Sequence, residues 1–222
     1  MYNSPFQMLA TDYDGTIATD GAIASDTEQA LLQAKDAGFL LALVTGREFD
    51  DLLNVCPQIK MFDLVVAENG AVLHFPVSGH IEILSSPPAD KFIRQMIHRN
   101  IPFSRGRVIA SVQSRYEEQV CSLIDKLELP LYIIRNKDAA MILPLGVDKA
   151  KGLEKGLRRF KITKHQVIGI GDAENDLPLL QFAGFRVAVA NADDILKNVA
   201  DWVTNKPSGE GVAEFIRKYL VK

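Results

Sequence analysis

The stretch QMLATDYDGTIATDG, residues Gln7–Gly21, places acidic residues directly behind a short apolar run. The run predicts a strand over Phe6–Thr11 that is buried within a sheet. Asp12 and Asp14 follow it two residues apart, so both side chains can face the same side of an extended chain. Like charges this close repel each other, and two explanations stay open. The stretch is either an ordinary acidic turn or part of the ligand set of a bound cation.

Short apolar runs and helical patterns alternate along most of the chain. Further strands are predicted at Phe39–Thr45, Asp63–Ala67, Gln166–Ile170 and Arg186–Ala190. Helices are predicted after a capping box of Ser25 and Glu28, ending before Gly38, and at Arg47–Val55, Lys149–Phe160, Asp176–Phe182, Asp193–Ala200 and Gly211–Leu220. Such alternation predicts an α/β fold with a Rossmann-like, doubly wound parallel sheet. Asp20 and Gly21 favour the turn of a small hairpin beside the first strand.

The middle of the chain interrupts this alternation. AENGAVLHF followed by VSGHIEIL, within residues 67–84, predicts a hairpin. Beyond a Pro-rich linker, the pattern is a helix, a strand at Arg107–Gln113, a second helix, and two strands at Leu131–Arg135 and Ala139–Pro144. Two helices over a three-stranded antiparallel sheet form a small α+β module. We therefore expect a discontinuous α/β core domain over residues 1–86 and 145–222, with an inserted α+β domain over residues 87–144.

Composition narrows the class of protein. The 222 residues carry a formal net charge of −3, which argues against a broad nucleic-acid-binding face. Cys56 and Cys121 lie outside any CxxC pattern, as expected for reduced thiols in the cytoplasm. The longest apolar runs, such as Phe39–Val44, are too short to span a bilayer, and the N-terminus is unlike a signal peptide. We expect a cytoplasmic protein with no nucleic-acid and no membrane partner, either a monomer or a homodimer.

Polar segments follow three of the predicted strands. Asp12 and Asp14 follow the first, Thr45–Arg47 follows the second, and GDAENDLP, residues Gly171–Pro178, follows the fourth. In an open parallel sheet, ligands bind outside the carboxyl ends of the strands, so these segments can converge on one crevice. Several carboxylates there suit a hard cation that prefers oxygen ligands, with Mg²⁺ the best candidate. Each segment alone has a plainer explanation as a turn or a helix cap, and only their joint occurrence favours one shared site.

The motifs DYDGT, TGR, VDKAKG and GDAENDLPLL, in this order, resemble the four motifs of the haloacid dehalogenase (HAD) superfamily. The inserted domain resembles the type IIB cap of the branch that includes Cof-type sugar phosphatases, sucrose-phosphate phosphatase and archaeal-type phosphoglycolate phosphatase. One motif departs from the family pattern, because many relatives have a glycine directly after the lysine of VDKAKG. That departure leaves Lys149 and Lys151 both open, and the position two residues after Val147 favours Lys149.

The resemblance implies a role for each motif residue. Asp12 would be the nucleophile that forms an aspartyl-phosphate, and Asp14 would be the general acid and base. Mg²⁺ would be held by Asp12, by the backbone carbonyl of Asp14, by Asp172 and, directly or through a neighbouring group, by Asp176. Thr45 and Lys149 would bind phosphoryl oxygens, because phosphoryl transfer depends on positioning and electrostatics. The residues expected to contact substrate are Thr45, Gly46, Arg47, Asn69, Lys149 and Asn175; for Asn69 a plain turn is the alternative.

The resemblance implies an enzyme with a small phosphorylated substrate. We expect a Mg²⁺-dependent phosphatase acting on a sugar phosphate or a phosphoglycolate-like acid through an aspartyl-phosphate intermediate. A phosphomutase of the same fold and a phosphoacceptor signalling module are the alternatives. The inserted domain would supply specificity, and its cations could bind a second anionic group or simply be solvated. These cations are Arg105, Arg107, Arg115, Arg135 and Lys137.

Overall fold

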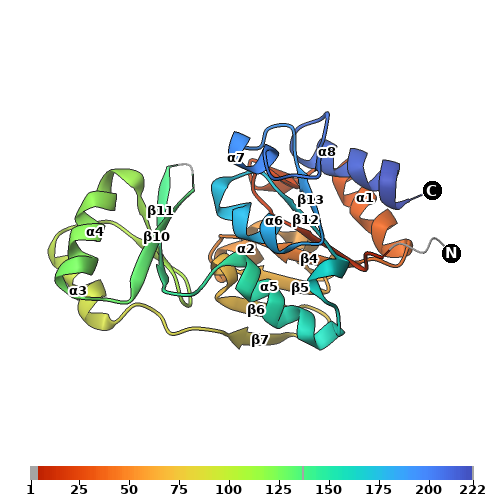
Figure 1. Cartoon of the computed structure of the whole chain (residues 1–222). Helices are drawn as coiled ribbons and strands as arrows, with labels where there is room; N and C mark the ends of the chain where they lie inside the picture. The colour runs from red at the N-terminus through yellow and green to blue at the C-terminus, as the bar shows by residue number, and fades with distance from the viewer. Residues whose placement is uncertain (1–4, 137, 222) are drawn as a thin grey trace.

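The computed structural model describes residues 5–136 and 138–221. It contains one large sheet and a smaller sheet set apart from it (Figure 1). The large sheet has the strand order β14-β13-β12-β1-β4-β5-β6-β7. Its strands are β1 (Met8–Thr11), β4 (Leu40–Val44), β5 (Leu64–Ala67), β6 (Val72–Phe75), β7 (His80–Ile83), β12 (Val167–Gly171), β13 (Phe185–Ala188) and β14 (Trp202–Val203).

The six strands from β14 to β5 run parallel, and β6 and β7 extend the sheet as an antiparallel hairpin. Every residue of β1, β5 and β12 is buried, as expected for parallel strands covered on both faces. The predicted Rossmann-like α/β core is therefore confirmed. Both ends of each of the five predicted strands lie within two residues of the predicted positions.

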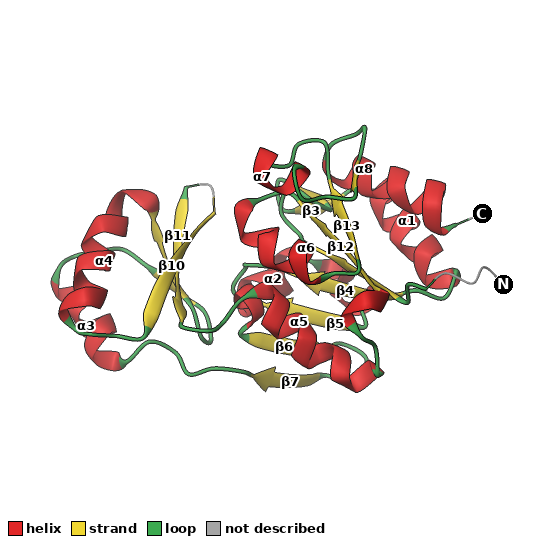
Figure 2. Ribbon diagram, viewed as in Figure 1, coloured by secondary structure: helices red, strands yellow, loops and turns green. Residues whose placement is uncertain are grey.

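Helices cover the large sheet (Figure 2). They are α1 (Ser25–Asp36), α2 (Phe49–Val55), α5 (Lys149–Leu157), α6 (Leu177–Phe182), α7 (Asp194–Lys197) and α8 (Ser208–Phe215), which continues as a π-helix over Ile216–Leu220. Helix α1 packs against α8, and α5 packs against α6. The predicted capping box of α1 is wrong: Ala24 is the N-cap, so the Ser25 hydroxyl lies one residue too late to cap the helix. Gly38 follows the helix end with a φ of 96°, as predicted.

The small sheet and two helices form a separate layer pair, which we call the cap. Its strands, in the order β10-β11-β9-β8, are β8 (Ser104–Arg105), β9 (Ala110–Gln113), β10 (Leu131–Asn136) and β11 (Ala139–Pro144). Helices α3 (Asp90–His98) and α4 (Glu117–Lys126) lie on the face of this sheet that points away from the large sheet (Figure 2). The inserted α+β module is thus confirmed, while its limits at residues 87 and 144 stay a prediction.

The cap sheet has four strands rather than the predicted three. The additional strand, β8, is only two residues long and pairs with β9, so it carries no periodic pattern that a sequence could reveal. Alternation along the strands sends Ala110 and Val112 into the apolar cluster under α3 and α4. Their neighbour Ser111, which pairs with Met141 of β11, therefore faces the large sheet. Lys137 lies outside the described residues.

Two smaller features complete the fold. Strands β2 (Ala18–Thr19) and β3 (Ala22–Ile23) form the small hairpin predicted near the first strand. Asp20 and Gly21 make its turn, with φ values of 52° and 77°. In the described part of the chain, no helix combines the length and the apolar character that crossing a membrane requires.

Candidate active site

The predicted polar segments meet at one edge of the large sheet. Asp12 directly follows β1, Thr45 follows β4 and Asp172 follows β12, and these three strands are neighbours in the sheet. The backbone N–H of Asp12 donates to the carbonyl of Ile170 at 3.0 Å, and that of Thr45 donates to Val66 at 2.8 Å. The parallel ladder thus continues one residue beyond the strands, which holds the first polar residues of each segment in register.

Three carboxylates from two of these segments form a buried cluster. One oxygen each of Asp12, Asp172 and Asp176 lies within 4.8 Å of the others. Asp176 is fully buried, and Asp12 and Asp172 are each 5% exposed. Buried charges of one sign are costly unless they are paired or bind a metal. The cluster could therefore hold a metal ion.

Lys149 enters this cluster from the first turn of α5. Its ammonium donates to Asp12 Oδ1 at 2.6 Å and to Asp176 Oδ1 at 2.5 Å, and its side chain is 1% exposed. Lys151 instead pairs with Asp148 at 3.0 Å on the surface, with 58% of its side chain exposed. Residues two positions apart on an α-helix point about 200° apart around its axis, so only one of the two lysines can reach the cluster. Of the two lysines left open by the motif, Lys149 is the one at the site.

The charges within the cluster do not balance. Burial raises the pKa of Asp12 well above its usual range, the charge of Asp176 raises it further, and Lys149 lowers it. For Lys149, burial lowers the pKa, but the charges and hydrogen bonds of Asp12 and Asp176 outweigh burial and raise it overall. If all three carboxylates are ionised, the single ammonium of Lys149 neutralises only one of the three negative charges, and a divalent cation would neutralise the other two.

Neighbouring groups hold the carboxylates in place. Asp176 Oδ2 accepts hydrogen bonds from the backbone N–H of Asp172 at 3.0 Å and of Ala173 at 3.1 Å. The Thr16 hydroxyl donates to Asp172 Oδ1 at 2.8 Å. A Cβ at Gly15 would lie 2.3 Å from Asp172 Oδ2, so only glycine allows this close approach. Buried, fixed oxygen donors of this kind fit a hard divalent cation.

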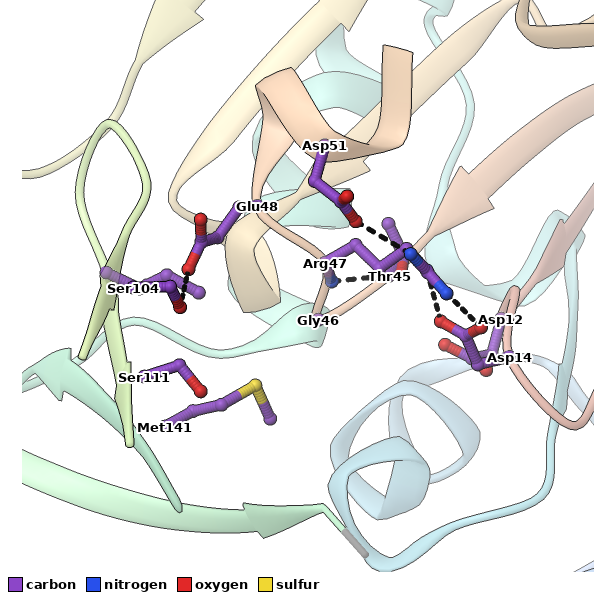
Figure 3. A pocket seen from close by; sticks show the side chains of 11 residues that line it. Asp12, Asp14, Thr45, Gly46, Arg47, Glu48, Asp51, Ser104, Ser111 and Met141 are labelled. Carbon is purple, nitrogen blue, oxygen red and sulfur yellow. Dashed lines mark hydrogen bonds and ion pairs between the residues drawn. The ribbon is translucent and has the colours of Figure 1, made fainter. Parts of the chain in front are cut away.

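Asp14 lies beside this cluster and pairs with Arg47. The guanidinium donates to both carboxylate oxygens, from Nε at 2.6 Å and from Nη2 at 2.8 Å, and its Nη1 donates to Asp51 at 2.7 Å (Figure 3). A bidentate pair of this kind fixes the orientation of both groups. Asp14 was predicted as a metal ligand through its backbone carbonyl; its carboxylate is not part of the three-carboxylate cluster.

A cavity of about 330 Å³ opens over Asp12 and Asp14, between the core and the cap. From the core it is lined by Asp12, Asp14, Thr45, Gly46, Arg47, Glu48 and Asp51, and from the cap by Ser104, Ile109, Ser111 and Met141. Figure 3 shows Ser111 and Met141 facing the core residues across this space. Ser104 Oγ donates to Glu48 at 2.5 Å across the same gap.

Other residues predicted to bind substrate lie outside this lining. Asn69 and Asn175 are buried next to it, where the Asn175 amide donates to Asn69 Oδ1 at 3.5 Å and the Asn69 amide donates to Met141 Sδ at 3.2 Å. The cap arginines point elsewhere: Arg107 pairs with Asp50 at 2.9 Å, Arg135 pairs with Glu117 at 2.8 Å, Arg115 stacks on Tyr116, and Arg105 does not line the cavity. Among the residues that line the cavity in the described chain, Arg47 is the single cation.

Several residues of the site escaped the sequence analysis. Thr16 belongs to the quoted DYDGT motif, but nothing in its spacing indicates that it bonds to Asp172. Glu48 directly follows TGR and Asp51 lies four residues after Arg47, and that proximity was the signal that could have pointed to them. The cap residues of the lining are small or apolar and carry no motif.

Family comparison agrees with this geometry. The family described as haloacid dehalogenase-like hydrolase matches residues 9–97 and 103–216 of the chain. The chain therefore belongs to the haloacid dehalogenase-like hydrolases, as its four motifs predicted. It is 33% identical over 223 residues to a phosphoglycolate phosphatase of Methanothermobacter thermautotrophicus, in an alignment that covers 96% of this chain and 98% of that protein.

Solved structures share the whole architecture. A protein of Thermoplasma acidophilum superposes with a TM-score of 0.83 at 20% identity, covering 96% of this chain and 97% of that one. A sugar phosphatase of HAD subclass IIB superposes with a TM-score of 0.77 at 20% identity, covering 96% and 98%. At these identities the likeness concerns the fold, and it confirms a HAD core that carries a small α+β cap.

Proposed function

We propose that the chain is a Mg²⁺-dependent phosphatase that hydrolyses a small phosphorylated metabolite through an aspartyl-phosphate intermediate. The observation that carries the proposal is the buried group of Asp12, Asp172, Asp176 and Lys149 at the strand ends, beside Asp14 and a cavity of about 330 Å³. The 33% identity with a phosphoglycolate phosphatase over nearly the whole chain supports the same class of enzyme. The inserted domain, residues 87–144, would act as the cap that closes over the substrate.

The chain's own residues account for both halves of the reaction. A carboxylate oxygen of Asp12 attacks phosphorus, the bond from phosphorus to the leaving oxygen breaks, and Asp14 gives that oxygen a proton. Asp14 then takes a proton from water, whose oxygen attacks phosphorus and breaks the bond to Asp12, releasing phosphate. Before Asp14 can donate, its carboxyl group must be released from Arg47. An incoming phosphoryl group offers that guanidinium a competing anion, which gives Arg47 a part in substrate binding.

Other residues hold the phosphoryl group and the cation. Lys149, next to Asp12, supplies positive charge, and the Thr45 side chain at the cavity wall supplies a hydroxyl. Asp12, Asp172 and Asp176, with the backbone carbonyl of Asp14, would hold Mg²⁺. When bound, this cation would supply positive charge that neutralises phosphoryl charge.

The cavity lining restricts the substrate. The cavity volume suits a small metabolite, and Arg47, the one cation among the described lining residues, is paired with Asp14 and Asp51. Phosphoglycolate is the first substrate to test, because the relative in Methanothermobacter thermautotrophicus is named a phosphoglycolate phosphatase. Small sugar phosphates are the second, because Glu48, Ser104 and Ser111 offer hydrogen bonds to hydroxyl groups. A cytoplasmic location without nucleic-acid or membrane partners is part of the same proposal.

Release of inorganic phosphate tests the proposal. Purified protein is assayed with p-nitrophenyl phosphate, phosphoglycolate and a panel of sugar phosphates, with Mg²⁺ and with a chelator. We expect Mg²⁺-dependent release, with at least one natural substrate exceeding p-nitrophenyl phosphate in kcat/KM. Absence of Mg²⁺-dependent release from every compound would refute the proposal. Interconversion of sugar-phosphate isomers with little phosphate release would assign a phosphomutase instead.

A further inference from the structure

Glu68 is a buried carboxylate that the reaction above does not use. It follows β5 directly and begins the short helical turn η2 (Glu68–Gly70). The residue is completely buried, and its φ of 54° lies in the left-handed region, as does that of Asn69 at 52°. Non-glycine residues in this region cost free energy and persist only where the surroundings enforce them. The strained turn aims the Glu68 carboxylate at the cap.

Backbone amides satisfy this carboxylate. Oε1 accepts from the N–H of Arg107 at 2.8 Å and of Phe49 at 3.2 Å, and Oε2 accepts from the N–H of Val108 at 2.7 Å and of Ile109 at 3.0 Å. Three of the four donors are consecutive amides of one cap turn, which together form a concave anion-binding site. Burial of a carboxylate is tolerated when several N–H groups bind it. Backbone amides of the cap thus form hydrogen bonds with the Glu68 carboxylate of the core.

The cap turn is shaped to receive the carboxylate. The N–H of Gly106 donates to the carbonyl of Ile109 at 3.0 Å, which closes the turn. A Cβ at Gly106 would lie 2.6 Å from Glu68 Oε1 and 2.8 Å from Oε2. Any other residue there would force the turn and the carboxylate apart.

The same turn forms the cap wall of the cavity. Ile109 both donates to Glu68 and lines the cavity, and Ser104 and Ser111 line it from either side of the turn. An ion pair also joins this turn to the core, between Arg107 and Asp50, whose side chain is 66% exposed. Exposed pairs contribute little to stability. Glu68 makes three hydrogen bonds to this turn, more than any other core side chain makes to the cap wall among the described residues.

We propose that Glu68 is a positioning residue: by binding the amides of residues 107–109, it holds the cap wall over the reacting carboxylates. The catalytic consequence rests on the proposed phosphatase function, whereas the attachment itself does not. Substrate contacts with the wall exist in the ground state and the transition state alike, so loosening it raises KM more than it lowers kcat.

Two variants loosen the attachment from opposite sides. Glu68→Gln replaces one acceptor oxygen by an amide N–H₂ group, so two of the four donors lose their partner. Gly106→Ala leaves Glu68 intact and displaces the turn, and it changes a cap residue outside the core. Asp50→Asn is the matched control, because it removes the exposed ion pair of the same turn but none of the Glu68 hydrogen bonds.

Amide hydrogen exchange on the full chain measures the attachment without any assay of activity. In the wild-type protein the amides of Arg107, Val108 and Ile109 should be protected. Their exchange should become about tenfold faster or more in Glu68→Gln and Gly106→Ala, and stay unchanged in Asp50→Asn. Wild-type amides that exchange at the rate of an unstructured peptide would overturn the proposal, even if neither variant folds. Unchanged protection in a folded Glu68→Gln protein would do the same.

Steady-state kinetics test the consequence. With the best substrate of the panel, KM should rise about three- to tenfold in both variants, with kcat changed less than about twofold, and Asp50→Asn should match the wild type. Faster exchange together with unchanged KM and kcat would show that the attachment does not position the wall, and would refute the role assigned to Glu68. A protein that shows the exchange effect but no phosphatase activity would refute the proposed function and leave the attachment standing.

Discussion

The two walls of the cavity are built in different ways. On the core side, the reacting groups follow hydrogen-bonded parallel strands, and Asp12, Lys149 and Asp176 are almost completely buried. On the cap side, the lining consists of neutral residues of short strands, attached to the core through the amides that bind Glu68. Because the charged groups lie on the core wall and the cap wall is neutral, we expect the core to perform the chemistry and the cap to select the substrate. Variants of the proposed reacting groups should change kcat, whereas variants of the cap wall, or of Glu68 that binds it, should change KM or nothing.

The largest effect is expected for the proposed nucleophile. Asp12→Asn removes the carboxylate that we propose attacks phosphorus, so kcat should fall by about 10⁴-fold or more. Asp20→Asn is the matched control, because Asp20 lies eight residues further along in an exposed hairpin turn. Initial rates of phosphate release measure both variants. Substantial activity in a folded Asp12→Asn protein would show that the core wall does not supply the nucleophile.

Asp14→Asn should follow, with a fall in kcat of about 10²–10⁴-fold. The loss should be larger for an alkyl phosphate than for p-nitrophenyl phosphate, because a good leaving group needs little help from a general acid. Comparing kcat for the two substrates in the variant and the wild type measures this difference. Equal losses for both substrates would argue that Asp14 serves through its pair with Arg47 rather than as an acid.

The two neighbouring lysines of α5 offer a matched pair. Lys149→Met removes the buried cation beside Asp12, and kcat should fall by about 10²–10³-fold. Lys151→Met removes an exposed ion pair with Asp148 and should change kcat by less than about twofold. If both variants kept wild-type activity, the buried ammonium would have no part in the reaction.

Metal binding should stabilise the protein more at high pH than at low pH. Burial raises the pKa of Asp12, and a raised pKa favours the folded state at low pH, a contribution that is lost as the pH rises through that pKa. A cation offsets this loss by binding the ionised carboxylates. Saturating Mg²⁺ should therefore raise Tm by about 5 °C at about pH 8 and by much less at about pH 5. Thermal unfolding with and without Mg²⁺ measures both shifts, and equal shifts would contradict the expectation.

The smallest effect is expected for an exposed arginine of the cap. Arg135→Ala removes a guanidinium whose side chain is 72% exposed and paired with Glu117, so kcat and KM should each change by less than about twofold. Kinetics with phosphoglycolate provide the measurement, because a carboxylated substrate is the one that an additional cap cation would assist. A rise in KM of tenfold would mean that Arg135 reaches the substrate when the cap closes.

Much of the core could be predicted from the sequence because its signals are local. Buried parallel strands are continuous apolar runs, and the carboxyl ends of such strands share one edge of the sheet, so the positions of Asp12, Thr45 and Asp172 followed from order alone. The strand bounds were correct to within two residues for the same reason. The capping box at Ser25 failed because one residue of offset decides whether a hydroxyl caps a helix.

Only the tertiary structure shows where side chains point and which residues distant in sequence come into contact. Lys149 and Lys151 are equivalent in a motif, and only the orientation of α5 sends one of them into the core. The charge of the cap arginines made them plausible substrate ligands, yet the folded cap pairs Arg107 with Asp50 and Arg135 with Glu117. No sequence pattern singled out Glu68: its three partners in the cap lie about forty residues away, and they are backbone amides, which every sequence contains. The sequence determined which functional groups follow the strands, and the tertiary structure determined which side chains and backbone groups surround them.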